Sequence, residues 1–502
     1  MNLAYAFARI GLRYGQRPAI VTEDGRTIPY ADFARRVQQV GSGLTQLGLG
    51  DGTRVALCIP DSPEELEVDY GILASPYMRV QLDPRGRVED VAACARDAEP
   101  EAIIFHASVA SLVDEATKGL DLRRIVVGGS AHEALGYEDW LRRDGDAPIP
   151  DRDEAGLKSI QYSSGTTSKP KGIVLTERNL LTLLGNLLSD RPVLPGDVFL
   201  HVRTLHLGSA TVIIEQLLGG GKVVLGGRFK PETFPDLVAR HKATSSSLVP
   251  THLVRQLDAS FDPAAFRTMR VITLGGAPAA PDTFEAALER IGNRFGVVYG
   301  LTEAAWHTHL NPEDLEVSPE RRRQLIRSVG REMFGYEVGI LDDDGRPVPR
   351  GEIGEVALRG DNLMAGYWRQ PELTAQTIRN GWLMTTDLGR QDGEGYLYIT
   401  GRKTLTINTG AYKVQPVEVE NALLAHTGVL EAVVFGVPDR EFGETVKALV
   451  VRKPDADISE QELMDFCRDR LTGWKKPRIL EFVSELPRNE HGKVMRPMLK
   501  AQ

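Results

Sequence analysis

The sequence is poor in cysteine and has no excess of positive charge. Its 502 residues include three cysteines, at positions 58, 94 and 467, which lie far apart and form no CxxC pair. So long a chain with so few cysteines is not built on a disulfide framework, and a reducing, cytoplasmic setting fits best. The formal net charge of -9 gives no support to a nucleic-acid partner held through its phosphates. Any phosphate ligand must therefore be bound by a local site.

Long apolar runs are also missing. Residues 1–18 alternate apolar side chains with Arg9, Arg13 and Arg17, so they lack the apolar segment of a secretory signal and predict an amphipathic surface helix. The apolar run 209–221 is interrupted by Glu215 and by glycines, well short of the roughly 18 residues that a membrane span needs. We expect a soluble protein without a membrane span, and peripheral membrane contact stays an open alternative.

Short β-branched runs alternate with helical patterns along most of the chain. Such alternation favours an α/β fold with mostly parallel sheets. Leucines at helical spacing after Thr176 predict a helix that Thr176 caps. Five runs end in glycine or a turn and predict buried strands at residues 53–59, 101–105, 123–129, 221–227 and 270–276.

The character of the sequence changes near Gly401. Beyond it, residues 431–439 and 446–454 predict strands, and Ser459, with Glu462 three residues later, predicts the start of a helix. We therefore expect two domains. Residues 1–401 would form a large N-terminal domain of layered sheets and helices, and residues 402–502 a small α+β domain of about 100 residues, an ordinary domain size.

The stretch SSGTTSKPKG, residues 163–172, is too polar for a core. It follows a predicted strand at 157–162, and we place it between that strand and the helix after Thr176, a setting in which a glycine-rich turn can present N–H groups to an anion. Hydroxyl groups, glycines and two lysines are the parts of a phosphate cradle. The stretch is not a Walker A loop, because Pro170 stands where that pattern requires glycine-lysine. The alternative is a solvated surface loop.

Four further motifs follow in order: YGLTEA at 299–304, GWLMTTDLG at 381–389, GYLYITGRK at 395–403 and PRNEHGKVMR at 487–496. Together with the polar loop they resemble the adenylate-forming superfamily, which includes acyl-CoA synthetases, the adenylation domains of peptide synthetases, and luciferase. One short motif has a real risk of chance agreement, whereas five in order are specific. The resemblance implies a large domain that binds ATP and an acid, and a mobile C-terminal domain that carries a catalytic lysine.

The resemblance also implies roles for individual residues. Lys493, Glu303 and Thr166 would be catalytic, with Lys493 neutralising charge on the α-phosphate and Glu303 binding Mg²⁺, a cation that prefers carboxylate and phosphate oxygens. The departing β- and γ-phosphates would be held by Ser163, Ser164, Gly165, Thr166, Thr167 and Lys171.

Adenine and ribose would lie against the motifs that follow. Tyr299, with Gly300 and Thr302, would stack on the adenine, which the segment 275–280 frames through Gly276, Ala277 and Pro278. Asp387 would accept hydrogen bonds from the ribose hydroxyls, and Arg402 would be a second ribose or phosphate ligand. For each residue the plainer alternative is an ordinary turn, core or surface role.

The sequence departs from the family pattern at several positions. Thr404 occupies the hinge position, where aspartate or lysine is usual, and Leu405 follows where an acid is common. Thr386 replaces the usual glycine before Asp387, and Arg79 and Gln81 are unusual in the first domain. The departures leave adenylation as the firmer expectation and weaken the second half-reaction.

For the acid substrate, the resemblance points to a pocket near His206, Trp306 and His307, which favours a small or aromatic carboxylic acid. Arg79 and Arg203 are candidates to recognise a second anionic group. The leading hypothesis is an ATP-dependent ligase that transfers the acyl group to coenzyme A or to the phosphopantetheine of an acyl carrier protein. The alternatives are a relative that makes an amide, one that activates nitrite to diazotise an aryl amine, and a non-catalytic nucleotide-binding regulator.

Overall fold

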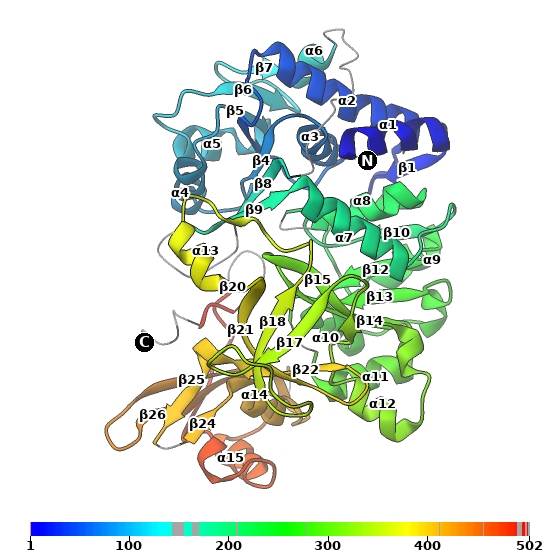
Figure 1. Ribbon diagram of the computed structural model, residues 1–502. Coiled ribbons are helices and arrows are strands. Elements are labelled where there is room, and N and C mark those ends of the chain that lie inside the picture. The colour runs from blue at the N-terminus through cyan, green and yellow to red at the C-terminus, as the bar shows by residue number, and fades with distance from the viewer. Residues whose placement is uncertain are drawn as a thin grey trace.

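The computed structural model describes residues 2–142, 155–162, 170–206, 209–277, 279–410, 412–454, 456–488, 494–496 and 499. Within these ranges the strands form four sheets (Figure 1). No helix in the same ranges is long and apolar enough to cross a membrane. The fold is the expected mixed α/β arrangement, with a large N-terminal part and a small C-terminal part below it in Figure 1.

The largest sheet has nine strands among the described residues, and its central strands are parallel. In spatial order they are β16 (Arg331–Glu332), β15 (Ala304–Leu310), β14 (Phe295–Leu301), β13 (Val271–Leu274), β12 (Ser245–Leu248), β10 (Val198–His201), β11 (Lys222–Leu225), β1 (Pro18–Val21) and β2 (Thr27–Pro29).

The second sheet has eight strands and a parallel centre. Its order is β19 (Gly366–Tyr367), β9 (Gly172–Thr176), β8 (Leu157–Tyr162), β4 (Met78–Gln81), β3 (Arg54–Cys58), β5 (Ala102–His106), β6 (Arg123–Val127) and β7 (Leu135–Gly136). The strands expected from all five apolar runs are present in these two sheets, and each is largely buried because parallel strands are covered on both faces.

Two smaller sheets complete the chain, the first antiparallel and the second antiparallel except for one parallel pair of strands. The first contains β17 (Glu337–Leu341), β18 (Gly354–Arg359), β20 (Ile378–Arg379), β21 (Trp382–Gln391) and β22 (Leu397–Arg402). The second contains β23 (Ile407–Thr409), β24 (Tyr412–Val414), β25 (Val429–Asp439), β26 (Gly443–Arg452) and β27 (Ile479–Phe482), so it is formed only by residues beyond 406. The exact division at residues 401 and 402 stays a prediction.

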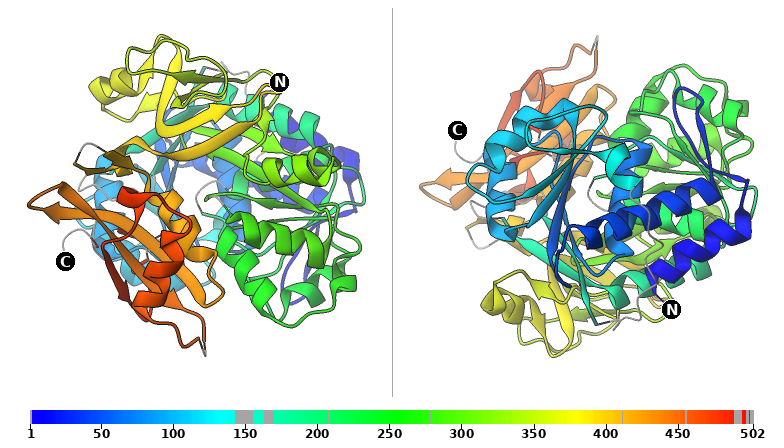
Figure 2. Two further views of the ribbon diagram at one scale, coloured as in Figure 1. Left: turned by 90° about the horizontal axis from the view of Figure 1, so that it is seen from below. Right: turned by 90° about the horizontal axis from the view of Figure 1, so that it is seen from above.

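Helices cover both large sheets, as Figure 2 shows from above and below. In the N-terminal part they are α1 (Leu3–Tyr14), α2 (Tyr30–Gln46), α3 (Pro63–Leu73), α4 (Val88–Ala98), α5 (Ala110–Ala116), α6 (Tyr137–Leu141), α7 (Glu177–Asp190), α8 (Ser209–Gly219), α9 (Phe234–His241), α10 (Pro250–Asp258), α11 (Pro281–Ile291), α12 (Pro319–Leu325) and α13 (Pro371–Thr377). The C-terminal part adds α14 (Pro416–Leu424) and α15 (Glu460–Arg468).

The helix starts predicted from the sequence are confirmed. Thr176 caps α7 through a capping box, because its hydroxyl accepts the Asn179 N–H (3.2 Å) while the Asn179 side chain accepts the Thr176 N–H (2.8 Å). Ser459 caps α15 by accepting the N–H of Glu462 (3.2 Å). The N-terminal segment forms the expected amphipathic helix, with its apolar face buried.

One expectation is wrong: the polar loop does not lie between a strand and a helix. It connects β8 to β9, which pair antiparallel with Tyr162 opposite Gly172, and α7 begins only after β9. The apolar run 173–175 has enough β-branched character to extend the sheet before the helix starts. The N–H groups at the start of α7 are therefore a whole strand away from the loop.

Candidate active site

Several predicted site residues lie at one edge of the nine-stranded sheet. The carboxyl ends of the parallel strands β10, β12, β13 and β14 meet there, and Gly276 and Ala277 follow β13 directly. Tyr299 and Gly300 belong to the end of β14, and Thr302 and Glu303 form the turn into β15. Ligands of open α/β sheets bind outside the carboxyl ends of the strands, so this edge is the expected place for a nucleotide.

Gly300 stands where the chain leaves no room for a side chain. A Cβ atom at this position would lie 2.5 Å from the backbone nitrogen of Trp306 and 2.8 Å from the carbonyl oxygen of Ala304. Trp306 itself adopts a positive φ of 49°. The hairpin made by the YGLTEA motif is therefore tightly folded, and it fixes Tyr299 and Glu303 relative to each other.

Asp387 joins two other predicted residues from distant strands. Its Oδ2 accepts the hydroxyl of Tyr299 (2.8 Å), and its Oδ1 accepts Nε of Arg402 (2.6 Å). Asp387 and Arg402 are direct neighbours across β21 and β22. Burial first, and the Asp387 charge second, raise the pKa of Tyr299 well above its usual value, so this phenol stays protonated and acts as a donor. A carboxylate has about four lone-pair positions, so Asp387 can still accept hydroxyl groups from a ligand.

Glu303 is held in place from the other large sheet. The hydroxyl of Tyr367 donates to its Oε1 (2.9 Å), and its carbonyl oxygen accepts the N–H of Met364 (2.8 Å). Tyr367 lies in β19, which pairs with β9 directly after the polar loop. The sequence did not predict Tyr367 as a site residue. The dipeptide Gly366–Tyr367 is the only local signal, and the contact of Tyr367 with Glu303 spans 64 positions. Within the described part of the chain, Oε2 of Glu303 has no protein partner.

The polar loop itself lies largely outside the described residues. This applies to Ser163, Ser164, Gly165, Thr166 and Thr167. It applies also to Pro278 and Lys493. Lys171 is described: it is half-buried and precedes β9, so it stands close to the strand that carries the Tyr367 contact. The roles predicted for all these residues stay predictions.

The three residues predicted to line the acid pocket have different surroundings. His307 is fully buried and stacks on Tyr336 with ring centroids 4.7 Å apart. Its Nε2 lies 3.0 Å from the carbonyl oxygen of Glu337, its Nδ1 lies 3.4 Å from the side-chain nitrogen of Asn362, and burial lowers its pKa to about 4. This neutral ring has no nitrogen left for a substrate.

Trp306 and His206 are half-buried. The guanidinium of Arg191 lies 4.8 Å from the centre of the Trp306 ring, and His206 follows the end of β10 at the sheet edge described above. His206 therefore comes from the strand end that also carries Arg203, while Trp306 comes from the hairpin. Their place in an acid pocket stays a prediction.

The two arginines proposed to recognise a second anion differ sharply. Arg79 is 1% exposed and donates through Nη1 to both carboxylate oxygens of Asp69 (2.7 and 2.9 Å). It also donates to the hydroxyl of Ser159 (3.0 Å), so it is not available to a substrate and that hypothesis is wrong. Arg203 lies at the sheet edge, where its Nη1 donates to the hydroxyl of Ser247 (3.1 Å).

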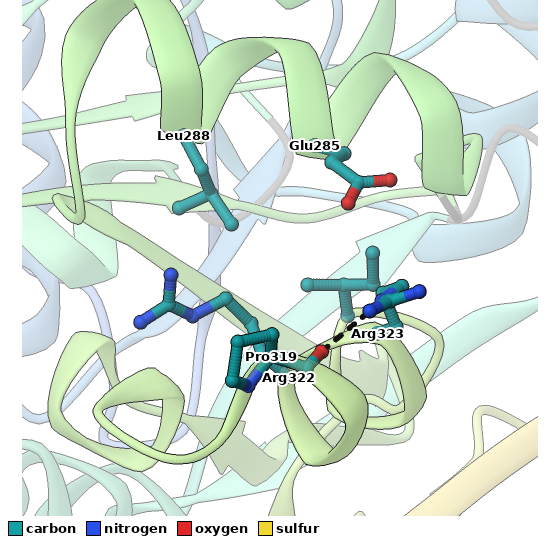
Figure 3. A pocket seen from close by; sticks show the side chains of 6 residues that line it. Glu285, Leu288, Pro319, Arg322 and Arg323 are labelled. Carbon is teal, nitrogen blue, oxygen red and sulfur yellow. Dashed lines mark hydrogen bonds between the residues drawn. The ribbon is translucent and has the colours of Figure 1, made fainter.

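A surface groove of about 320 Å³ lies elsewhere, between α11 and α12. Figure 3 shows Glu285 and Leu288 on one side of it and Pro319, Arg322 and Arg323 on the other. None of the predicted site residues lines this groove. Among the described residues there is also no group of three or more histidines, cysteines or acids that could hold a metal ion by itself.

Comparison with known proteins matches residues 7–368 to the family described as AMP-binding enzyme and residues 418–493 to the AMP-binding enzyme C-terminal domain. A sulfoacetate–CoA ligase of Cupriavidus necator is 31% identical over 99% of this chain and 96% of its own length. Two solved structures align with 100% of this chain and 99% of their own, each at 29% identity. They are ATP-bound MatB of Rhodopseudomonas palustris, with a TM-score of 0.90, and the amide bond synthetase McbA of Marinactinospora thermotolerans, with a TM-score of 0.89.

Proposed function

This chain belongs to the family of AMP-binding enzymes, and from that premise we propose how its site performs the reaction. The protein is an AMP-forming acid–thiol ligase that activates a carboxylic acid with ATP and transfers the acyl group to coenzyme A. We propose further that the acid is small or aromatic, and that the phosphopantetheine of a carrier protein can replace coenzyme A.

The observation that carries the assignment of residues is the cluster of Tyr299, Asp387 and Arg402 at the carboxyl edge of the sheet. Asp387 would accept the two ribose hydroxyls while Tyr299 and Arg402 hold it in orientation. The face of Tyr299 and the segment around Gly276 and Ala277 would frame the adenine. With the nucleotide bound in this way, the α-phosphate would lie toward the Glu303 turn.

In the first step a carboxylate oxygen of the acid attacks the α-phosphorus, the bond from that phosphorus to the bridging oxygen breaks, and pyrophosphate leaves. Negative charge gathers around the phosphorus in the transition state, so fixed donors and cations lower the barrier. Lys493 would supply a positive charge there. The loop residues Ser163 to Thr167, with Lys171, would hold the departing pyrophosphate.

Glu303 is the residue that would hold Mg²⁺. Its Oε1 accepts the Tyr367 hydroxyl, which orients the carboxylate and leaves Oε2 without a protein partner in the described part of the chain. One carboxylate oxygen together with substrate phosphates is a usual ligand set for Mg²⁺, which would neutralise phosphate charge when bound.

We also propose that the protein works in the cytoplasm. Its three cysteines are free, and two of them, Cys58 and Cys467, are buried. Burial raises the pKa of Cys467 to about 11 and that of Cys58 still further, so neither is a reactive thiolate at neutral pH. Unpaired thiols are typical of a reducing compartment.

A second candidate is that the adenylate is passed to an amine. The observation that favours it is the similarity to an amide bond synthetase over the whole chain. The hinge residue Thr404 is also unusual for an enzyme that must rotate its C-terminal domain to transfer to a thiol.

Pyrophosphate release tests the function. We expect release that depends on one class among aromatic, aliphatic and dicarboxylic acids, and a thioester product when coenzyme A is present. The same acids with an amine, and nitrite with an aryl amine, form the comparison arms. Pyrophosphate release that does not depend on coenzyme A and yields an amide would establish the second candidate instead. A protein that binds ATP but releases no pyrophosphate in any arm would contradict both candidates.

A further inference from the structure

Arg203 lies at the same sheet edge as the proposed adenine site but farther along it. It follows the end of β10 by two residues, and Ser247, which accepts its hydrogen bond, lies near the end of the neighbouring strand β12. Strand β13, which leads to Gly276 and Ala277, is the next neighbour of β12. At about 4.8 Å between strands, Arg203 is roughly 10 Å from that segment, the span of a short acid attached to an adenylate.

The charge of Arg203 is unbalanced. Arg36, Arg79 and Arg191 each have a carboxylate oxygen of a buried acid within 2.8, 2.7 and 3.4 Å. Arg203 has no carboxylate within 4.0 Å among the residues that the structure describes, and its partner is the neutral hydroxyl of Ser247. Burial lowers the pKa of its guanidinium. Arg203 is half-buried, and a partly desolvated cation without a counter-ion is unfavourable in a folded protein unless a ligand supplies the opposite charge.

Two histidines, the buried His201 and the half-buried His252, add polar groups beside Arg203 without adding charge. Burial first, and the Arg203 charge second, lower the pKa of His201 to about 3 and that of His252 to about 4, so both rings are neutral at pH 7. Within the described ranges, Nε2 of His201 and Nδ1 of His252 are buried without a hydrogen-bond partner. The His252 ring stacks on Phe229, with centroids 4.4 Å apart.

Asp61, which contacts the backbone near Arg203, belongs to a different set of contacts. Asp61 accepts the N–H of Leu205 through Oδ1 (2.8 Å), and the charges that act on it include those of Arg85, Arg228 and Asp83. Burial raises the pKa of Asp61, and burial is the one cause that lowers the pKa of Arg203. Asp61 therefore does not neutralise Arg203.

We propose that Arg203, positioned by Ser247, binds a second anionic group, a carboxylate or a sulfonate, at the end of the acid substrate remote from the carboxylate that is activated. This inference rests on the proposed function and narrows its substrate to short dianionic acids. A guanidinium matches both oxyanions because it can donate two parallel hydrogen bonds to them. The same charge disfavours an acid that places an apolar chain there, because that chain would leave the guanidinium buried and unpaired.

The test compares acids in pairs that differ by one group. Propanoate against sulfoacetate, butanoate against succinate, and 4-methylbenzoate against terephthalate each replace a methyl group with an anion. We expect wild-type protein to prefer the anionic member of at least one pair in kcat/KM for pyrophosphate release. Arg203→Gln should reduce that preference about 100-fold, as expected when one partner of a buried charge pair is removed.

A second variant tests the same charge in case the Arg203→Gln protein does not fold, and a control variant removes a different charge. Ser247→Asp keeps Arg203 but gives it a counter-ion, so it should abolish the same preference. Arg228→Gln removes an exposed charge that follows β11 at the same edge, and should leave the preference within about threefold.

Two outcomes would overturn the inference: an unchanged preference in a folded Arg203→Gln protein, or a wild-type preference for the methyl member of every pair. Both leave the adenylation reaction intact. Absence of pyrophosphate release with every acid, in protein that binds ATP, would instead remove the proposed function, and the inference would fall with it.

Discussion

At the scale of single residues, the contacts of Asp387 allow its proposed role in ligand binding to be separated from a structural role. A close counterpart exists nearby: Asp392, directly after β21, accepts Nη2 of Arg321 (2.8 Å) and the hydroxyl of Tyr398 (3.1 Å), just as Asp387 accepts Arg402 and Tyr299. The two acids share partner types and differ in place, since Asp387 lies at the proposed ribose site. The pair separates a ligand role from a structural one.

We predict that Asp387→Asn lowers kcat/KM for ATP about 10- to 100-fold, the usual loss when a charged hydrogen-bond acceptor is removed. Steady-state pyrophosphate release at varied ATP measures it. The control Asp392→Asn loses an equivalent arginine and tyrosine pairing and should leave ATP kinetics nearly unchanged. Equal losses in the two variants would mean that Asp387 acts only on the fold.

Thr386, next to Asp387, has a strained backbone because it stands where glycine is usual. Its φ is 63°, in the left-handed region where a β-branched side chain is strained by about 1 to 3 kcal/mol. This explains why the resemblance leads one to expect glycine there. The N–H of Thr386 donates to Oε1 of Glu355 (3.0 Å), which helps to hold the strained backbone beside the site.

At the scale of elements, α3 and β4 explain the unusual arginine and glutamine of the first domain. Arg79 and Gln81 are two residues apart on β4 and so share one face of the strand, whereas Glu65 and Asp69 are four apart on α3 and share one face of the helix. Arg79 pairs with Asp69 (2.7 Å), and the side chain of Gln81 donates to Oε1 of Glu65 (3.4 Å). All four residues are buried.

Glu65 makes this interface depend on pH. Burial first, and the Asp69 charge second, raise its pKa well above the usual value of 4.5. The folded protein therefore binds a proton that the unfolded chain has released above about pH 4.5, so this group's contribution to stability is lost as pH rises toward the raised pKa.

We predict that Glu65→Gln increases the free energy of unfolding at pH 8 by about 1 to 3 kcal/mol, because a neutral amide replaces a buried acid whose ionisation is unfavourable. At pH 4 the difference should be small. Urea denaturation at both pH values measures it, with Glu89→Gln on the exposed side of α4 as the control. A variant that is less stable than wild type at pH 8 would contradict the argument.

At the scale of the whole molecule, the segment around Arg402 joins the two parts of the chain. Lys403 donates to Asp343 (2.6 Å) and Glu355 (3.1 Å) of the large part, while the side chain of Gln415, beyond the junction, accepts the N–H of Arg402 (3.2 Å). A Cβ on Gly401 would lie 2.1 Å from the Gln415 amide oxygen, so a larger residue here would displace the Gln415 side chain from this contact. Exposed Thr404 lies between these two anchors, in a short 3-10 turn.

We predict that Thr404→Pro slows thioester formation by about tenfold or more and changes adenylation little, because proline fixes φ and restricts the preceding residue at the proposed hinge. Single-turnover measurement of pyrophosphate release and of thioester formation separates the two steps. Thr404→Ala, which leaves the backbone free, is the control. Equal slowing of both steps would count against a hinge at this position.

The sequence by itself determined the buried parallel strands, the helix caps at Thr176 and Ser459, and the chemistry of ATP-dependent acid activation. These follow from local patterns: β-branched runs indicate buried strands, capping residues indicate helix starts, and an ordered set of motifs indicates the reaction. The local pattern misplaced the polar loop, because the three apolar residues after it form a strand only when β8 lies beside them.

Only the tertiary structure decided which side chains meet. Tyr299 reaches Asp387 across 88 positions, Tyr367 reaches Glu303 across 64, and Ser247 reaches Arg203 across 44. Two arginines that the sequence could not tell apart therefore have different partners: Arg79 pairs with the carboxylate of Asp69, whereas Arg203 donates to the hydroxyl of Ser247. The physical reason is that a local pattern fixes backbone conformation and burial, whereas the counter-charge of a buried group depends on the order of strands in a sheet, and residues distant in sequence set that order.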